Sequence, residues 1–188
     1  MSQDLPTTSY ALLGLLSFGD DLSGYELKQR ADRTLRFYWV SPAMSQVYTE
    51  LARLTQLGLV QAREDTTAPT RSTRRYQITT TGKSDLQRWL STATVEFPAL
   101  KHPIALRLLM GHLVEPETSG SMLEDYLALL AERRAELQAV HDSLTVDPTS
   151  PVGRSRFPRM VADWGLDYYE SERVMVEELI RRLAEVED

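Results

Sequence analysis

The chain has 188 residues, of which 42% are hydrophobic and 26% are charged, a balance typical of a soluble globular protein with one domain or two small ones. The sequence contains no cysteine, which excludes disulfides and cysteine-ligated metal sites. It has no apolar run long enough to cross a bilayer and no N-terminal signal-peptide pattern, so we expect a cytoplasmic protein without a membrane partner.

The net charge of −6 is unevenly distributed along the chain. Residues 1–80 contain nine Lys and Arg residues against eight Asp and Glu residues, whereas residues 81–188 contain twelve against nineteen. An acidic protein can carry a locally basic face, so the total charge does not exclude a nucleic-acid partner.

Two short helices are predicted at the start of the chain. The first follows Thr7 or Thr8, either of which can serve as its N-cap, and Gly19 suits the position after its end. The second is marked by Ser23 and Glu26, which stand at the spacing of a capping box. In this motif each of the two side chains accepts a hydrogen bond from the backbone N–H of the other residue.

A third helix is predicted from Ser41, as its N-cap, to about Gly58, with Pro42 at its first position. Its apolar stripe consists of Met44, Val47, Leu51 and Leu54. The opposite face carries Ser45, Gln46, Thr49, Ala52 and Arg53. A solvated helix face is usually rich in Glu and Lys, whereas hydroxyl, amide and guanidinium groups can bind base edges and phosphates.

Residues 60–78 change to the alternating pattern of two strands with a polar, basic loop between them. Three helices followed by such a hairpin is the order of a winged helix, in which the third helix enters the DNA major groove and the hairpin, or wing, lies on the backbone. We therefore predict DNA contacts by Lys28, Ser41, Ser45, Gln46, Thr49, Arg53, Arg71, Arg74 and Arg75. For any single one of them, ordinary solvated surface is an equally good interpretation.

Three segments of this part of the chain resemble, in order and spacing, the signature segments of PadR-type transcriptional regulators: "GYELKQRA", "SQVYTELARLTQLGLV" and "RRYQITTTGKSDLQRWL". The resemblance covers residues 9–92, and "FPALKHPIALRLLMGHLVEPE" is similar to the start of the C-terminal region in the subgroup where that region is long. It implies a homodimeric winged-helix DNA-binding protein, usually a repressor and often released by a small molecule, with residues 41–57 as the recognition helix. It also implies that Tyr48 and Tyr25 lie at or near the DNA-facing surface. For Tyr48, packing against the wing is an equal alternative, and for Tyr25 packing is the better interpretation.

The rest of the chain is predicted to be helical. A fourth helix starts at residues 81–82, and its apolar face consists of Leu86, Trp89 and Leu90. The proline-bearing segment "VEFPALKHP" that follows is the expected domain boundary. It divides the chain into a winged-helix domain at 1–95 and a helical domain at 96–188, which opens with the short apolar helix "IALRLLMGHL".

Two long helices are predicted in the second domain. The first, from about Gly120 to Leu144, has a heptad seam interrupted by Arg134 and His141, and the last helix keeps an apolar stripe to the C-terminus. Two helices with such narrow seams cannot bury them alone, so we expect a second copy of the chain to cover them. The expected dimer interface consists of Leu123, Leu127, Leu130, Leu137, Leu144, Met175 and Leu179.

The family resemblance further implies a small aromatic effector, which we expect between the winged helix and the C-terminal helices. The candidate effector-binding residues are Trp39, Trp89, Arg134, His141, Trp164 and Tyr168. Aromatic rings can stack on a planar ligand, although an aromatic stripe at helical spacing more often belongs to a core.

An enzyme is not expected. The three histidines include no pair at i,i+4, and the motifs GxGxxG, GxxxxGK[ST] and GxSxG are absent, so no catalytic residue, metal or cofactor is predicted. The predicted function is that of a dimeric, sequence-specific DNA-binding regulator, a repressor released by a small aromatic effector. The alternatives are a winged-helix module that binds a protein partner and an architectural DNA-binding protein that needs no effector.

Overall fold

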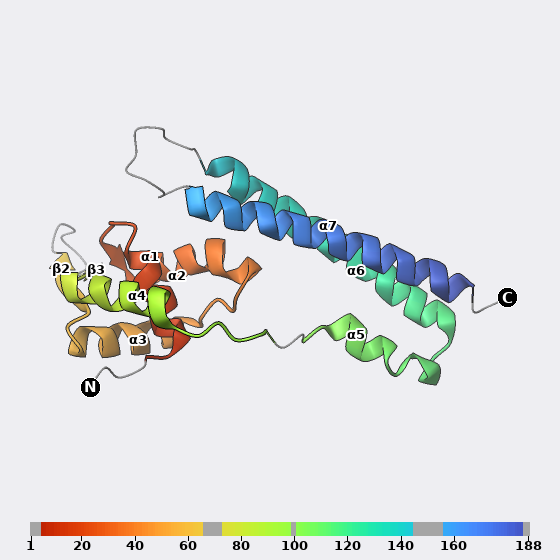
Figure 1. Ribbon diagram of the computed structural model, residues 1–188, viewed down its shortest axis with the longest axis horizontal. Helices are drawn as coiled ribbons and strands as arrows, with labels where there is room; N and C mark the ends of the chain where they lie inside the picture. The colour runs from red at the N-terminus through yellow and green to blue at the C-terminus, as the bar shows by residue number, and fades with distance from the viewer. Residues whose placement is uncertain (1–4, 66–72, 99–100, 145–155, 186–188) are drawn as a thin grey trace. The chain divides into compact units, whose positions relative to one another are not determined.

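The chain divides into two compact units, Met1–Glu96 and Phe97–Asp188. In Figure 1 the first consists of short helices and strands, and the second is dominated by two long helices. The computed structural model describes residues 5–65, 73–98, 101–144 and 156–185.

The first unit has the element order of a winged helix. Its elements are α1 (Thr7–Leu16), β1 (Leu22–Ser23), α2 (Gly24–Thr34), the 3-10 helix η1 (Leu35–Phe37), α3 (Met44–Gln56), β2 (Val60–Asp65), β3 (Thr73–Ile78) and α4 (Thr80–Thr92). The predicted fold of three helices and a hairpin wing is confirmed, with β2 and β3 antiparallel from the pair Val60–Ile78 to the pair Asp65–Thr73. The sheet has one strand more than the hairpin, because β1 pairs with β3. A strand of two residues is too short to show an alternating pattern.

The first two helices begin in different ways. The capping box of α2 is confirmed: the Glu26 N–H donates to Ser23 Oγ at 3.2 Å, and the Ser23 N–H donates to Glu26 Oε2 at 2.8 Å. The predicted threonine cap of α1 is wrong, because Thr7 and Thr8 lie inside the helix and Pro6 holds the N-cap position without a side-chain bond. Proline suits this position because its restricted φ prepares the chain for the first turn.

Helix α3 begins later than predicted. Its N-cap is Ala43, whose backbone N–H donates to Gln46 Oε1 at 3.0 Å. Ser41 therefore does not cap the helix, and its side chain instead donates to Asp32 of α2 at 2.6 Å. The end of the helix agrees with the prediction, since Gly58 follows it with a φ of 71°, a conformation that favours glycine.

The start of α4 is fastened to the chain just after α3. Thr79 is its N-cap: its hydroxyl accepts the Gly82 N–H at 3.0 Å and donates to the Gly58 carbonyl at 2.8 Å. A Cβ added at Gly82 would lie 2.1 Å from the carbonyl oxygen of Leu59, so only glycine allows this close approach. The helix thus starts at Thr80, just before the predicted residues 81–82, and its N-terminus fixes the end of α3.

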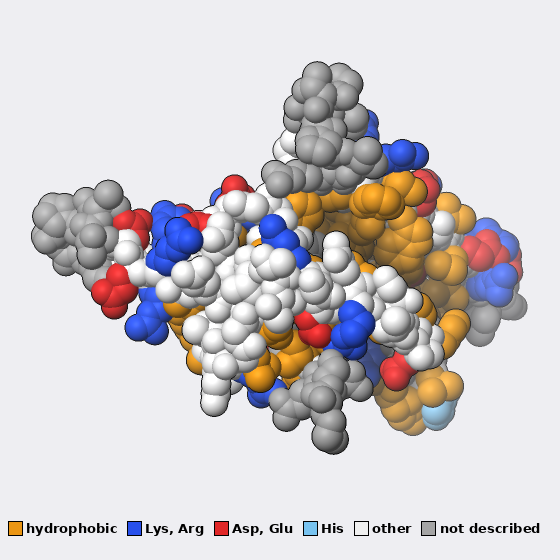
Figure 2. All heavy atoms as spheres, turned by 60° about the vertical axis from the view of Figure 1, so that its left-hand side comes forward, with side chains coloured by type: hydrophobic (Ala, Val, Ile, Leu, Met, Phe, Trp, Pro, Cys, Tyr) orange, Lys and Arg blue, Asp and Glu red, His pale blue; other side chains and the backbone are white. Residues whose placement is uncertain are grey.

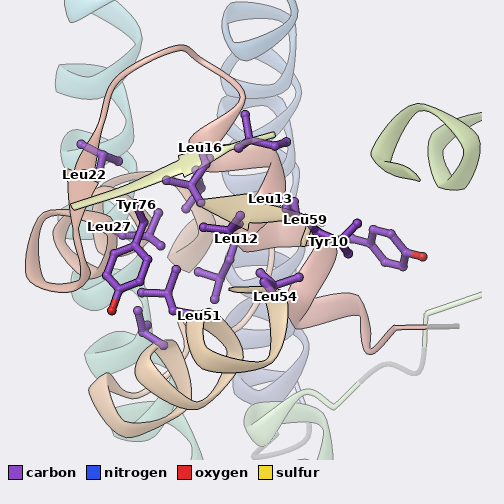
Figure 3. Packing of buried hydrophobic residues seen from close by; sticks show 14 of the residues in the cluster. Tyr10, Leu12, Leu13, Leu16, Leu22, Leu27, Leu51, Leu54, Leu59 and Tyr76 are labelled. Atoms are coloured by element: carbon purple, nitrogen blue, oxygen red, sulfur yellow. The ribbon is translucent and has the colours of Figure 1, made fainter. Parts of the chain in front are cut away.

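The hydrophobic core of the first unit is formed within one chain (Figure 3). The apolar stripe of α3 is fully buried at Val47, Leu51 and Leu54, and leucines of α1 and α2 belong to the same cluster. The fourth helix contributes Leu86, whereas Leu90, predicted to lie on the same apolar face, is exposed. The exposed face of α3 is therefore held by a packed core behind it.

The second unit is a helical hairpin with a short helix before it. Its elements are α5 (Pro103–Leu108), the 3-10 helix η2 (Gly111–Leu113), α6 (Pro116–Ser143) and α7 (Arg156–Ala184). Helices α6 and α7 lie side by side and antiparallel (Figure 1). Their apolar cluster is built around Ile104, Leu123 and Val176. None of the described helices is both long enough and apolar enough to cross a membrane.

The structure corrects the central part of the predicted dimer interface. Leu123, Leu130 and Leu137 are buried in the single chain, where α6 packs against α7. The heptad pattern marks a buried helix face, and in this hairpin the covering helix belongs to the same chain. These three leucines are therefore not available to a second copy.

The other predicted interface residues are more accessible. Leu127, Leu144 and Leu179 are partly buried, and Met175 is exposed. Helix α7 also exposes a face of large apolar side chains, which is here called the α7 apolar face and consists of Phe157, Met160, Val161, Trp164, Tyr168 and Met175. Hydrophobic side chains are visible over a broad area of the long helices in Figure 2.

Candidate nucleic-acid interface

The exposed side of α3 is polar along its length. Ser45, Gln46, Thr49 and Arg53 are exposed, and the fully buried Val47 lies on the opposite side of the helix. The structure thus brings four of the predicted DNA contacts onto one surface. None of them is an acidic residue or a lysine, so this surface offers neutral donors and acceptors together with one guanidinium.

Two of these side chains also make local hydrogen bonds. The carbonyl oxygen of Gln46 accepts the Ala43 N–H, which leaves its amide nitrogen as a donor for another partner. Thr49 Oγ1 donates to the Ser45 carbonyl at 2.9 Å and can still accept. These bonds restrict the two side chains in advance, so less conformational freedom is lost when they meet a ligand.

Lys28 and Ser41 are joined through an acidic residue of α2. The Lys28 ammonium pairs with Asp32, the Ser41 hydroxyl donates to the same carboxylate, and Lys28 lies 3.4 Å from Ser41 Oγ. The hydrogen bonds from Lys28 and Ser41 lower the pKa of Asp32 below its usual range. Asp32 thus offsets much of the positive charge that Lys28 was predicted to offer to a phosphate.

The two adjacent arginines of the wing have different environments. Arg75 pairs with Asp65 at 2.9 Å and with Glu26 at 3.3 Å, and it donates to the Asp21 carbonyl at 2.6 Å. The hydrogen bond to Asp65 is the main reason why the pKa of Arg75 is raised. Arg75 therefore ties β3 to β2 and to the start of α2, and these pairs compete with its predicted role as a phosphate contact.

Arg74 is exposed and lies opposite Glu64 in the hairpin. In Figure 2, basic and acidic side chains lie close together on the described part of the hairpin, at the left of the view. The third predicted wing residue, Arg71, lies outside the described residues. Arg74 is thus more accessible to a phosphate than Arg75.

The two tyrosines of the signature segments differ from the predictions. Tyr48 is half exposed, and its ring lies directly on Gly24, where an added Cβ would be 2.5 Å from the ring. It therefore packs on the start of α2. Tyr25 is 58% exposed, so the prediction that it packs inside the domain is wrong.

One charged residue on the buried side of α3 was not among the predicted site residues. Glu50 is only 9% exposed, accepts a hydrogen bond from the hydroxyl of Ser9 in α1, and lies 3.6 Å from Arg53 Nε. A glutamate between Val47 and Leu51 interrupts an apolar stripe, and this interruption is the signal that sequence reasoning could have used.

The predicted effector-binding residues of the first unit occupy different surroundings. Trp89 stacks on Tyr10 with ring centroids 4.6 Å apart and an interplanar angle of 9°, and it packs against the core. Trp39 is exposed just after η1. Of the two rings, Trp39 is therefore the more accessible for stacking on a ligand.

In the second unit the structure separates the predicted effector residues into groups. Trp164 and Tyr168 stack on each other at 6.1 Å within the α7 apolar face. His141 pairs with Asp163 at 3.0 Å. Arg134 lies instead on a groove of about 430 Å³ between α6 and α7, and this groove is lined by Leu127, Leu130, Ala131, Arg134, Ala135, Gln138, Tyr169, Arg173 and Glu177.

A buried polar cluster near the start of α5 is a further feature that the sequence did not indicate. His102 Nε2 lies 2.7 Å from Glu172 of α7, and the hydroxyl of Tyr126 in α6 donates to the same carboxylate at 3.3 Å. Burial and the nearby Glu172 charge raise the pKa of Tyr126. The cluster joins three helices of the second unit. The described residues hold no group of three or more His, Cys, Asp or Glu side chains arranged to bind a metal ion.

Comparison with known protein families gives two adjacent matches. Residues 12–88 match the transcriptional regulator PadR-like family, and residues 100–184 match the family called virulence activator alpha C-term. Among curated proteins, the negative transcriptional regulator PadR of Bacillus subtilis (strain 168) is 27% identical over 135 residues, which is 72% of this chain and 73% of that protein.

Solved structures share the fold over nearly the whole chain. Bacillus subtilis PadR in complex with operator DNA has a TM-score of 0.82 and 22% identity, covering 95% of this chain and 99% of that one. The same protein in complex with p-coumaric acid has a TM-score of 0.75 and 24% identity, again covering 95% and 99%. The Vibrio cholerae virulence activator AphA has a TM-score of 0.70 and 20% identity, covering 95% and 98%.

Proposed function

We propose that the chain is a PadR-like transcriptional regulator: a homodimeric repressor that binds operator DNA through α3 and is released by a small aromatic effector. The observation that carries this proposal is the exposed face of α3, with Ser45, Gln46, Thr49 and Arg53 on one surface of a winged helix. Helix α3 would lie in the major groove, and the wing would lie on the backbone.

The chemistry of this face favours DNA over a protein partner. Amide and hydroxyl groups match the donors and acceptors of base edges, and a guanidinium matches guanine or a phosphate. The central part of a protein-binding surface is typically rich in large apolar or aromatic side chains. The polar face of α3 has only Ala52 as a small apolar residue, with the half-exposed Tyr48 at its edge. A sequence-independent architectural protein would bind DNA mainly through unpaired cations. In this chain Lys28 is paired with Asp32, and Arg75 is paired with Asp65 and Glu26.

The homodimer is supported by the α7 apolar face. Large exposed apolar side chains on one side of a helix are unfavourable in water unless another surface covers them. A second copy of the chain is the simplest cover, because most oligomers are symmetric and two recognition helices can then bind two half-sites. Linking two half-site contacts raises operator affinity without any new contact.

The effector is supported by the relative that was crystallised with p-coumaric acid. We propose a planar aromatic molecule, uncharged or weakly acidic, for which Trp39, Trp164 and Tyr168 are the exposed rings among the predicted effector residues of the single chain. Such a molecule releases DNA only if it binds the arrangement that cannot bind DNA better than the arrangement that can. A difference of about 1.4 kcal/mol already changes affinity tenfold.

The DNA-binding proposal is tested by selecting sequences from random DNA with the purified protein. We expect a two-fold related pair of half-sites. Gln46→Ala and Thr49→Ala should each cost about 1–3 kcal/mol on the selected sequence and relax the preference at one position of each half-site. If wild-type protein selects no sequence, or if both variants lose affinity equally for random DNA, the base-reading role of α3 is refuted.

The adjacent wing arginines provide a matched pair of variants. Arg74→Ala should weaken binding to all sequences alike and reduce the dependence of log affinity on log salt by about one unit. Arg75→Ala should instead lower thermal stability and leave the salt dependence unchanged, because its guanidinium is engaged by Asp65 and Glu26. Identical salt slopes for wild type and Arg74→Ala would contradict the wing contact.

The effector proposal is tested by tryptophan fluorescence with a panel of phenolic acids and planar drugs, measured together with operator release. At least one quencher should also release DNA, and Trp164→Leu should weaken both effects. A panel in which no quencher releases DNA would refute the proposal, and unchanged release from the Trp164→Leu variant would remove Trp164 from the site.

A further inference from the structure

The carboxylate of Glu50 lies beneath the DNA-facing side of α3. Its residue is 9% exposed, and it stands on the same helix as the fully buried Val47 and Leu51. A carboxylate in such a position is costly unless hydrogen bonds and opposite charge compensate for the water that it loses. Its partners therefore indicate what this residue does in the unit.

One partner is Ser9 of α1, which is completely buried and donates its hydroxyl to Glu50 Oε2. Ser9 is in the first turn of α1, a helix whose own first turn has no acidic residue and whose N-cap makes no side-chain bond. A negative charge near a helix N-terminus is stabilised by the unpaired N–H groups and the helix dipole. Glu50 thus fastens α3 to the start of α1.

The other partner is Arg53, whose Nε lies 3.6 Å from the same oxygen of Glu50. The arginine side chain is about half exposed and belongs to the polar face, whereas the glutamate is inside. The contact is an ion pair without a hydrogen bond and lies on the Nε side, so the terminal nitrogens Nη1 and Nη2 remain available as a planar fork. This fork matches the O6 and N7 acceptors of guanine, the commonest specific contact of an arginine with DNA.

We propose that Glu50 is a positioning residue that holds the Arg53 guanidinium for bidentate recognition of a guanine in the half-site. The inference rests on the proposed DNA-binding function. It adds which base Arg53 recognises and which residue orients Arg53. A flexible arginine at the surface would meet any nearby phosphate, whereas the charge of a buried carboxylate 3.6 Å from Nε restricts the directions that Arg53 takes. The partly neutralised side chain also gains less from phosphates, which favours specific over random DNA.

The experiment compares selected and random DNA binding for wild type, Glu50→Gln, Arg53→Ala, Arg53→Lys and the double variant Glu50→Gln/Arg53→Ala. We expect one guanine in the wild-type half-site to lose its preference in each variant. Glu50→Gln should weaken operator binding by about tenfold, the size of one bidentate contact, with random DNA bound as well as before or slightly better. In the Arg53→Ala background the Glu50→Gln change should have no further effect on affinity.

A merely structural role of Glu50 predicts different results. Equal weakening by Glu50→Gln with and without Arg53, or equal weakening on random and selected DNA, would overturn the proposal. Retention of the guanine preference by Arg53→Lys would overturn it as well, and this result decides the question even if Glu50→Gln does not fold, which thermal unfolding reports. A wild type that selects no sequence refutes the proposed function itself and the positioning role with it.

Glu64→Gln is the matched control for loss of one negative charge near DNA. Glu64 is exposed on β2 of the wing, an element separate from α3. This variant should strengthen binding to all sequences alike and keep the guanine preference. A loss of the same preference in Glu64→Gln would show that charge alone sets it, and the positioning role of Glu50 would be refuted.

Discussion

The two units of the chain bury their apolar residues in different ways. The winged-helix unit packs side chains from α1 to α4 into one cluster, with leucines of three helices fully inside (Figure 3). In the second unit the cluster around Ile104 has few buried members, and α7 leaves Phe157 63% and Trp164 61% exposed. The first unit has a complete core in one chain, and the second does not.

The opposite side of α7 makes the difference clearer. There Arg173 pairs with Glu170 and Glu177, and Arg181 pairs with Glu178, all at helical spacings. A surface made of such pairs is typical of a helix face in water. Helix α7 thus has a charged face and an apolar face, and the apolar one is the surface that the proposed second copy would cover. The proposed DNA reading and the proposed assembly would therefore lie on units with different stability requirements.

The largest predicted effect breaks the assembly and leaves the winged helix intact. Trp164→Glu should weaken dimerisation by about 3–6 kcal/mol, since a two-fold interface loses the burial of one large side chain from each copy. Sedimentation at micromolar concentration should then show monomers, and operator affinity should fall because both half-sites are no longer bound together.

Leu90→Glu is the control, because Leu90 is an exposed leucine on α4 of the other unit. We expect this variant to remain dimeric. A wild type that sediments as a monomer would remove the basis of the dimer proposal, and a dimeric Trp164→Glu variant would move the interface to another surface.

The second prediction concerns the core of the first unit. Leu51→Ala should lower the free energy of unfolding of this unit by about 2–5 kcal/mol, because the side chain is fully buried behind the DNA-facing surface. The exposed Leu57→Ala should change it by less than about 0.5 kcal/mol. Hydrogen exchange resolved by peptide separates the two units in this measurement.

The dependence of hydrogen-exchange protection on protein concentration is a further way to distinguish the two units. Protection of the winged-helix unit should not depend on concentration, whereas protection of α6 and α7 should rise as the dimer forms. Equal concentration dependence in both units would contradict the view that the first unit is complete within one chain.

Much of the fold follows from patterns that the sequence displays. The capping box of Ser23 and Glu26, the stripe of Val47 and Leu51, and the alternating strands of the wing all rest on neighbours within a few residues. Such local patterns depend on helix and strand geometry alone, so they predict which elements form. They predict exact ends less well, as Ala43 in place of Ser41 at the start of α3 illustrates.

The site was less predictable because its chemistry depends on distant partners. Arg74 and Arg75 are adjacent arginines that the sequence does not distinguish. Only the fold brings Glu26 close to Arg75. The bond between Ser9 and Glu50 joins residues 41 positions apart. The seam leucines of α6 are a related case, since a heptad predicts that a face is buried but not which chain covers it.

The smallest predicted effect concerns Glu26, an acidic residue at the start of α2 whose negative charge stabilises the first unit. Hydrogen bonds from the Ser23 backbone and hydroxyl, with the nearby Arg75, lower the pKa of Glu26 below its ordinary value of 4.5. Its ionised form therefore stabilises the folded unit above that value, and the contribution is lost as the pH falls through the lowered pKa. Glu26→Gln keeps an acceptor in the capping box and loses the charge, so we expect a loss below about 1 kcal/mol near neutral pH.

The pH dependence distinguishes this contribution from a general loss of packing. In urea unfolding measured between about pH 7 and pH 3, the curves of wild type and Glu26→Gln should converge at the acidic end, where Glu26 is protonated as well. Glu178 is the comparison on α7, with a pKa lowered to about 2 by the exposed Arg181 and Arg182. Salt should abolish the effect of Glu178→Gln and spare that of Glu26→Gln, because bonds to Ser23 are not screened as surface ion pairs are. Parallel curves down to the lowest pH would mean that Glu26 acts through its shape and not through its charge.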